Sequence, residues 1–343
     1  MGCRGQRRWP ARVAIVGRGR GVARWLGIVV GLAVGGSGVG VARADRNDLR
    51  LANLCNSSSG ACDWFKPSPT GGTTVVLDPQ APARFRSLMS ELGVAVAPRL
   101  QTPADTLGFA GVQISAELGF TEISNNHSFW DGTEGVQPLN TKVSRPPGAL
   151  ATVGAFVRKG MFYPVPAIEL GAGAVNVLQS GMWALQAYGK IALQEGFHDT
   201  PLPSVAVRIA FSDLVGTDQV DLDVWGVDAV LSKAFGVGGT VRLEPFAGWN
   251  LLLIDAKSNL VDAPAQGGPA PSAVMKFRFP DQNLILRNRW YAGAKVRLWK
   301  LFLTAEVAFA PAGHSSDGSA SSGMASDGSQ SQKSACLSAG FDL

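Results

Sequence analysis

The chain has 343 residues, 46% of them hydrophobic, and its 31 basic and 26 acidic side chains give a formal net charge of +5. A positive excess is typical of nucleic-acid-binding proteins, but here it is confined to residues 1–44, which hold eight arginines and no acid. The other 23 basic and 26 acidic residues make the rest of the chain mildly acidic, so we expect no nucleic-acid partner. The low charged content argues against disorder, and four cysteines are too few for a disulfide scaffold.

Residues 1–44 have the three regions of a secretory signal peptide in the usual order. Residues 1–25 are rich in arginine, residues 26–41 are uncharged, and residues 42–44 (Ala-Arg-Ala) form a small-x-small cleavage site before Asp45. The uncharged stretch is short and rich in small residues, which disfavours a membrane anchor. The sequence therefore predicts a signal peptide at 1–44 that is cleaved during export.

Residues 45–105 are expected to form an N-terminal extension on the periplasmic side. They contain six prolines, at 67, 69, 79, 82, 98 and 103, and one short helix is expected near 84–92. Cys55 and Cys62 flank a Ser/Gly-rich loop, and we expect them to pair because disulfides persist outside the cytoplasm. No histidine lies near them, so no metal site is predicted there, and the chain has no phosphate-binding glycine loop, zinc spacing or nucleotide motif that would predict another cofactor. A lumen plug is a further possibility that the residues leave open.

Residues 106–343 alternate apolar and polar side chains over long runs, the pattern of strands with two different faces. In 204–212, for example, Val207 and Ile209 lie on one face and Arg208 lies on the other. We expect ten such strands, at 107–121, 150–159, 165–177, 183–194, 204–213, 220–232, 240–254, 284–298, 301–310 and 334–343. These runs are longer than the strands of a soluble β-sandwich, and a tilted strand of this length crosses a membrane. The sandwich and a helical span at 170–189 are the alternatives.

The lengths of the connections indicate which end of such a barrel faces outward. Outer-membrane barrels have short periplasmic turns and longer outer loops. Counting back from a periplasmic C-terminus places the long connections 122–149, 255–283 and 311–333 on the outer side. The outward aromatic residues Phe120, Trp183, Phe211 and Phe309 fall at the same ends of their strands, as expected for an interfacial girdle.

The last ten residues, SACLSAGFDL, alternate and end at the chain terminus. They resemble the C-terminal strand of Gram-negative outer-membrane β-barrel proteins, although those usually end in Phe and this strand has Phe341 and ends in Leu343. The resemblance is at the level of the class and covers about 107–343. It implies an outer-membrane location, contact with lipid and recognition by the barrel-assembly machinery. We therefore expect an all-β fold, a transmembrane up-and-down antiparallel β-barrel of about ten strands (range 8–12), with the extension attached. No residue pattern indicates the oligomeric state.

The predicted lumen face carries charges of both signs. Its positive residues are Arg158, Lys190, Arg208, Arg242, Arg287, Arg289, Lys295 and Arg297, and its negative residues are Glu117, Glu169, Asp221, Asp223, Glu244 and Glu306. Two interpretations remain: internal ion pairs that fill a narrow barrel, or a basic stripe along 287–297 that lines an anion-favouring pore.

The function expected first is passive, porin-like passage of small solutes, or a structural barrel with a plugged lumen. The alternative is a surface-binding or adhesion barrel, for which the first long outer loop offers His127, Trp130, Asp131 and Glu134 as candidates.

An outer-membrane lipid hydrolase is the least favoured alternative. The chain has two histidines besides His127. His198 is expected in an inner turn, and His314 lies in a Ser/Gly-rich loop with no expected neighbour to orient it. We therefore expect no catalytic residue and no enzyme.

Overall fold

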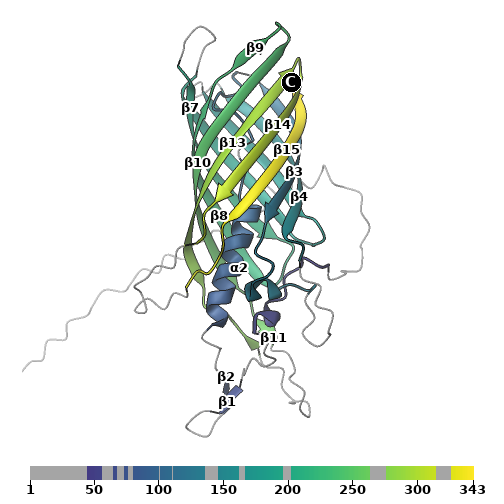
Figure 1. The fold of residues 1–343 in the computed structure, drawn as a ribbon, viewed down its shortest axis with the longest axis vertical. Coiled ribbons are helices and arrows are strands. Elements are labelled where there is room, and N and C mark those ends of the chain that lie inside the picture. The colour runs from purple at the N-terminus through teal and green to yellow at the C-terminus, as the bar shows by residue number, and fades with distance from the viewer. Residues whose placement is uncertain are drawn as a thin grey trace, which may run out of the picture. The chain divides into compact units, whose positions relative to one another are not determined.

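The computed structural model describes residues 45–55, 65–67, 73–75, 80–99, 101–109, 111–135, 146–161, 167–195, 202–262, 276–313 and 326–343. The predicted signal peptide lies outside these residues. Ten long strands form one sheet: β3 (Val112–Glu122), β4 (Ala149–Met161), β5 (Ile168–Val177), β6 (Trp183–Gln194), β7 (Ser204–Val215), β8 (Val220–Ser232), β10 (Val241–Ser258), β13 (Gln282–Leu298), β14 (Leu301–Ala310) and β15 (Gln332–Asp342). Each pairs antiparallel with the next, and β15 pairs with β3, so the sheet closes into an up-and-down barrel (Figure 1).

The predicted fold class is confirmed, and each of the ten predicted runs is a strand. The bounds of β6, β8 and β14 agree with the prediction to the residue. The helical alternative at 170–189 is wrong, because these residues form β5, a turn at 178–182 and the first half of β6. The sandwich is excluded because the ten long strands close on one another, so that each of them is paired on both sides.

Short elements complete the described chain. They are η1 (Leu51–Cys55), β1 (Phe65–Pro67), β2 (Thr73–Val75), α2 (Ala81–Val96), η2 (Ser128–Asp131), β9 (Phe235–Val237), β11 (Val261–Asp262) and β12 (Lys276–Phe277). A tight turn at 238–240 joins β9 to β10, and Gly238 and Gly239 there have φ of 61° and 77°, which favour glycine. Among the described residues, no helix is both long and apolar enough to cross a membrane.

The two ends of the barrel differ. We call the end with the C-terminus and the connections 162–167, 195–203, 233–240 and 299–300 the turn end. The loop end carries the connections 123–148, 259–281 and 311–331, together with the tight turns at 178–182 and 216–219. The three long connections therefore lie at one end, as their lengths predicted.

The outer wall of the barrel is apolar around its middle. The outward side chains of Ile209, Leu286 and Leu303 are more than half exposed. Outward charges on the described strands stand near strand ends, such as Lys159 at the turn end and Asp213 at the loop end. An apolar band of this kind on a barrel wall is suited to contact with lipid.

Outward aromatic side chains border this band at both ends. Phe120, Trp183 and Phe309 are exposed near the loop end, while Trp299 and Phe341 are exposed at the turn end. Aromatic rings prefer the headgroup level of a bilayer, so the two rows are consistent with the two membrane interfaces.

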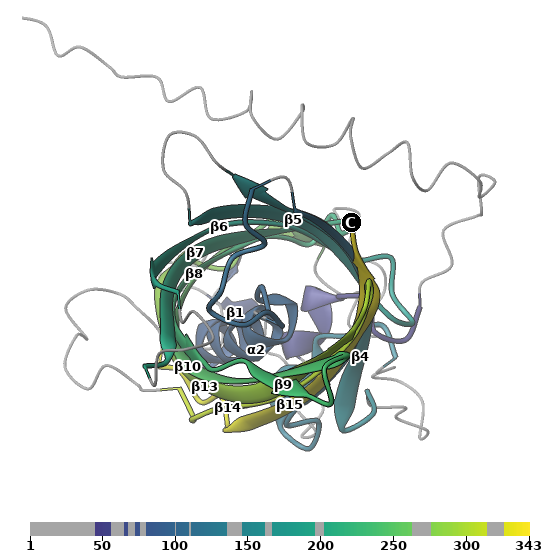
Figure 2. The same ribbon diagram turned by 90° about the horizontal axis from the view of Figure 1, so that it is seen from above.

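The helix α2 and the segment 97–107 that follows it lie inside the barrel (Figure 2). Pro82 is tolerated in the first turn of α2, where its missing N–H would have no helical partner. The helix ends before Pro98, which disfavours a helical conformation for Ala97, whose ψ is 145°. The expected short helix is therefore present and longer. Of the expected extension, residues 45–55 lie at the loop end and α2 lies inside the barrel.

The loop-end half of the lumen is filled by apolar side chains. Phe85 and Leu88 of α2 are fully buried, as are Leu252 and Ile254 of β10. At Gly93 the helix comes so close to the wall that a Cβ atom would lie 2.7 Å from Ile254 Cδ1. The helix is therefore closely packed against the inner surface of the barrel.

The apolar half explains an error in the predicted lumen face. Asp221 and Asp223 of β8 point outward with the exposed Trp225, and the inward residues there are Leu222 and Val224. The prediction assumed that charged faces point inward, which fails where the lumen is filled by a helix.

Candidate functional site

The turn-end half of the lumen holds buried ion pairs. Arg158 Nη2 lies 2.5 Å from Glu117 Oε1, and Lys190 Nζ lies 3.1 Å from Glu169 Oε2. The side chains of both pairs are at most 5% exposed. A buried charge needs a partner to offset its desolvation, so these residues are suited to pairing within the wall and poorly suited to a hydrated pore.

Arg208 pairs with a residue that the sequence did not indicate as inward. Its Nε lies 2.7 Å from Asp228 Oδ2, and both side chains are completely buried. The tight turn at 216–219 sets the β7–β8 register, which places Arg208 directly opposite Asp228. This register is the signal from which the inward acid of β8 could have been found.

The wall also binds the backbone of α2 where the helix ends. Gln186 Nε2 and Ser212 Oγ donate hydrogen bonds to the carbonyl oxygen of Val96, at 2.8 and 3.0 Å. Arg289 Nη2 donates to Pro98 O at 2.5 Å, and Arg208 Nη1 donates to Arg99 O at 2.9 Å. The last carbonyls of a helix have no helical donors, so Gln186 and Ser212 supply the missing partners of Val96 O, and the two arginines place favourable positive charge just beyond the helix.

Further towards the turn end, acids and hydroxyls of the wall accept from the amides of the same segment. Gln101 N donates to Glu306 Oε2 at 2.9 Å, and Leu107 N donates to Glu169 Oε2 at 3.2 Å. Lys190 Nζ donates to Pro103 O and Asp105 O, at 3.1 and 2.9 Å. Lumen side chains thus form hydrogen bonds with the segment 96–107 from the end of α2 to the turn end.

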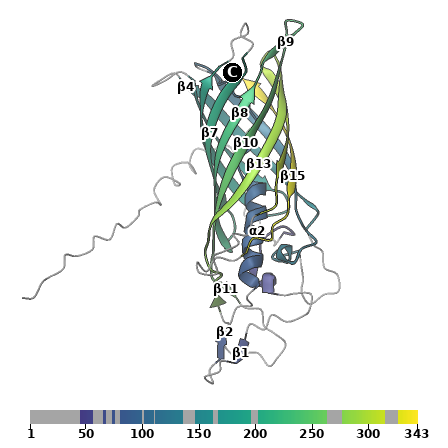
Figure 3. The ribbon, with the colours of Figure 1, turned by 60° about the vertical axis from the view of Figure 1, so that its left-hand side comes forward.

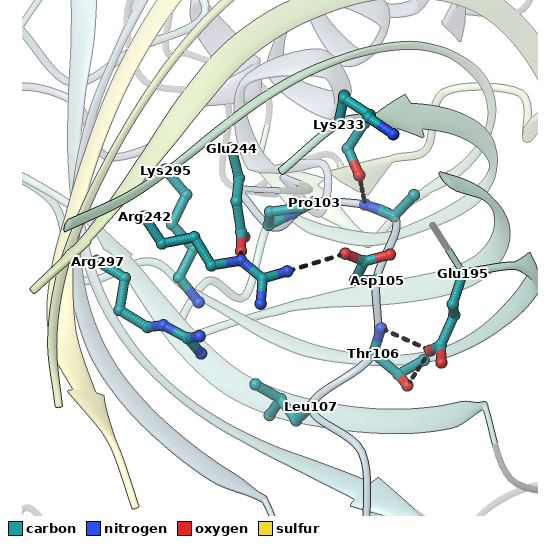
Figure 4. A network of polar contacts seen from close by, with 12 residues as sticks. Pro103, Asp105, Thr106, Leu107, Glu195, Lys233, Arg242, Glu244, Lys295 and Arg297 are labelled. Carbon is teal, nitrogen blue, oxygen red and sulfur yellow. Dashed lines mark hydrogen bonds and ion pairs between the residues drawn. The ribbon is translucent and has the colours of Figure 1, made fainter. Parts of the chain in front are cut away.

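A second charged cluster lies at the turn end around Asp105 (Figure 4). Arg242 Nη2 lies 3.1 Å from Asp105 Oδ2, and the same guanidinium forms an ion pair with Glu244. Lys295 and Arg297 lie 3.4 and 3.6 Å from Asp342 Oδ2. Positive and negative groups are balanced here, so the cluster has no strong preference for anions.

Thr106 fixes the last part of the segment to the rim of the barrel. Its backbone N and its Oγ1 both donate to Glu195 Oε1, at 3.1 and 2.5 Å (Figure 4). A polar cavity of about 280 Å³ opens beside this segment at the turn end, whereas the space beside Ala95 and Arg99 measures about 10 Å³. The second space is about the size of one water.

Each basic side chain of the predicted stripe on β13 forms a hydrogen bond or an ion pair. Arg287, at the loop-end side of the stripe, donates to Ser90 Oγ and Ser329 Oγ at 2.9 and 2.6 Å, and also to the carbonyls of Pro311 and Gln330. The remaining members contact Pro98 O and Asp342, as described above. Among the described residues, these contacts leave no row of free cations along an open channel.

Glu91 of α2 is a buried carboxylate that the sequence gave no reason to single out. It is 0% exposed and accepts hydrogen bonds from Ser124 N, Trp130 Nε1 and Gln330 N, at 2.9, 2.7 and 2.9 Å. The three donors come from two long connections at the loop end. Glu91 therefore joins the helix inside the barrel to both of these connections.

The proposed ligand-binding residues of the first loop are largely part of this fold. Trp130 and Asp131 are 1% and 6% exposed, so they are not available to a ligand at the surface. His127 is exposed and stacks on Phe129, and Glu134 forms a surface ion pair with Arg50. The four candidates therefore do not converge on one site.

Three other predicted features lie outside the described residues, at Cys62, His198 and His314. Within the described part of the chain, no group of His, Cys, Asp and Glu side chains is arranged to hold a metal ion. Cys336 there is a buried free thiol.

No protein-family model matches the chain, and no curated protein matches its sequence. Among solved structures, it is similar to the outer membrane protease OmpT from Escherichia coli, at 8% identity and a TM-score of 0.30, over 72% of this chain and 98% of that one. It is also similar to the beta domain of the Bordetella autotransporter BrkA, at 12% identity and a TM-score of 0.31, over 68% and 99%. Neisserial surface protein A matches at 10% identity and a TM-score of 0.26, over 68% and 95%. The chain resembles Gram-negative outer-membrane β-barrel proteins at the level of the class.

Proposed function

We propose that this protein is a non-enzymatic outer-membrane β-barrel whose lumen is closed by its own residues 80–107. In this account the barrel is a rigid scaffold for its loop end and does not serve as an open porin. The observation that carries the proposal is the set of hydrogen bonds between lumen side chains and the backbone of residues 96–107.

The energetics of the lumen support a closed state. Opening a path would separate buried charges such as Lys190 and Arg208 from the carbonyl oxygens that they now contact. It would also pull Leu88 and Phe85 out of a closely packed apolar interior. Each loss costs free energy, and these losses occur together because α2 and the segment 97–107 that follows it make all the contacts.

The apolar band and its two aromatic borders support the membrane location. A soluble protein seldom exposes apolar side chains on all sides, whereas a membrane barrel requires them. A closed sheet is also the form of β-structure that satisfies its backbone hydrogen bonds within lipid.

Membrane fractionation and solute uptake test the proposal. We expect the protein in the outer-membrane fraction, with a migration on gels that changes on heating. Liposomes that contain the intact mature chain should swell in an isosmotic small sugar no faster than empty liposomes. Recovery in the soluble periplasm, or fast swelling with the intact chain, would overturn the proposal.

A further inference from the structure

The described chain begins at one end of the barrel and finishes at the other (Figure 3). Residues 45–55 contact the connections at the loop end, α2 and residues 97–107 run through the lumen, and β3 starts at the turn end. The C-terminal Leu343 exchanges backbone hydrogen bonds with Val112 at that same turn end. The two termini of the folded part therefore lie on opposite sides of the apolar band.

Residues 45–55 are bound to the loop end by specific hydrogen bonds. Asn47 donates from its backbone N to Gln179 O and from Nδ2 to Leu178 O, at 2.9 and 2.8 Å. Asp48 Oδ1 accepts from Gly181 N at 2.7 Å. These bonds attach the segment to the tight turn between β5 and β6.

The same segment also contacts the other two connections nearest to it. Leu51 N donates to Gln219 Oε1 at 3.2 Å, and Asn53 Nδ2 donates to Thr133 O at 3.0 Å. Leu51 and Leu54 are fully buried in the apolar cluster that continues into the lumen. Residues 45–55 thus form a folded cap on the loop end.

The lengths of the connections assign the loop end to the cell exterior. Outer-membrane barrels place long loops outside and short turns in the periplasm. The three long connections share the end at which the cap sits, and the two-residue turn Trp299–Lys300 lies at the opposite end beside the C-terminus.

We propose that this barrel carries its own N-terminal segment through the lumen and displays residues 45–55 on the cell surface. This inference rests on the outer-membrane location proposed above. It adds that the segment which closes the lumen also connects a surface-exposed cap to the start of β3 at the periplasmic end.

Labelling with a membrane-impermeant maleimide tests this topology. Asp45→Cys and Lys300→Cys are introduced singly into the full chain with Cys3→Ser, Cys55→Ser and Cys62→Ser, and the parent without an added cysteine gives the background from buried Cys336. Both target side chains are exposed. We expect Asp45→Cys to be labelled in intact cells and Lys300→Cys to be labelled only after the outer membrane is permeabilised.

Two checks keep the result interpretable. Heat-modifiable migration shows which variants are folded, and Arg50→Cys replaces Asp45→Cys if that variant does not fold, since Arg50 is exposed and forms only a surface ion pair. A folded, membrane-bound protein whose cap cysteine is labelled only after permeabilisation would overturn the inference and leave the closed barrel standing. Absence of the protein from the outer membrane would instead overturn the proposed function.

Discussion

Arg208 and Asp228 form an ion pair in the middle of the barrel, with Nε 2.7 Å from Oδ2 and neither side chain exposed to solvent. Arg208 also donates to Arg99 O, so the pair links two strands of the wall to the segment inside. Replacing Arg208 with Met should leave a buried, unpaired carboxylate and lower the free energy of unfolding by about 3–5 kcal/mol. Urea unfolding in detergent micelles measures this change.

The matched control for this prediction is Arg297→Met. Arg297 is on the inward face too, but its side chain is 36% exposed and lies 3.6 Å from Asp342. A partly solvated pair contributes at most about 1 kcal/mol. Equal effects of the two substitutions would contradict a sealed, low-dielectric lumen around Arg208.

Glu91 should be the most sensitive polar residue of α2. Glu91→Ala removes the acceptor of Ser124 N, Trp130 Nε1 and Gln330 N, and each donor left buried without a partner costs about 1–3 kcal/mol. We expect faster proteolysis of the connection 123–135 and a shift in tryptophan fluorescence. Glu134→Ala, which removes only a surface pair with Arg50, should change neither.

The apolar half of the lumen should respond as a protein core does. Leu88 is fully buried, and Leu88→Ala should lower the free energy of unfolding by about 2–5 kcal/mol. Leu303→Ala on the lipid-facing wall removes the same atoms without making an internal cavity, so its effect should be smaller. The heating temperature at which gel migration changes reports on both variants, and a larger effect of Leu303→Ala would contradict the packing described.

Lys190 should hold the segment at the turn end in place. Lys190→Met removes the donor to Pro103 O and Asp105 O, so hydrogen exchange at the amides of Ala104, Thr106 and Leu107 should become faster. Lys159→Met, on an outward-facing position of β4, should leave these amides unchanged. Unaltered exchange in Lys190→Met would show that the segment is held by its other contacts alone.

The wall of the barrel was predictable because its physical signal is local. Strict alternation from Ser204 to Ser212 divides the strand into an apolar and a polar face, and short turns fix the register of neighbouring strands. The arrangement of the extension was not predictable in this way. Contacts such as Gln101 N to Glu306 join residues 205 positions apart, and no periodicity in the sequence records them.

The wrong inward assignment of Asp221 and Asp223 also arose because the sequence pattern does not record the contacts of the extension inside the barrel. Alternation divides β8 into two faces but does not say which face is inside. The assignment relied on the rule that the charged face of a strand points into the lumen. At the loop end the apolar face points inward instead, because α2 fills the lumen there and offers apolar contacts to Leu222 and Val224. The first inward charged residue of β8 is Asp228, which lies opposite Arg208.

Single-channel recording in a planar bilayer tests the closed lumen most directly. The intact mature chain is expected to give no conductance steps, and a folded variant that begins at Gly108, and so lacks the cap, α2 and the segment 97–107, is expected to give them. Regular conductance steps from the intact chain, with the segment in place, would contradict the account.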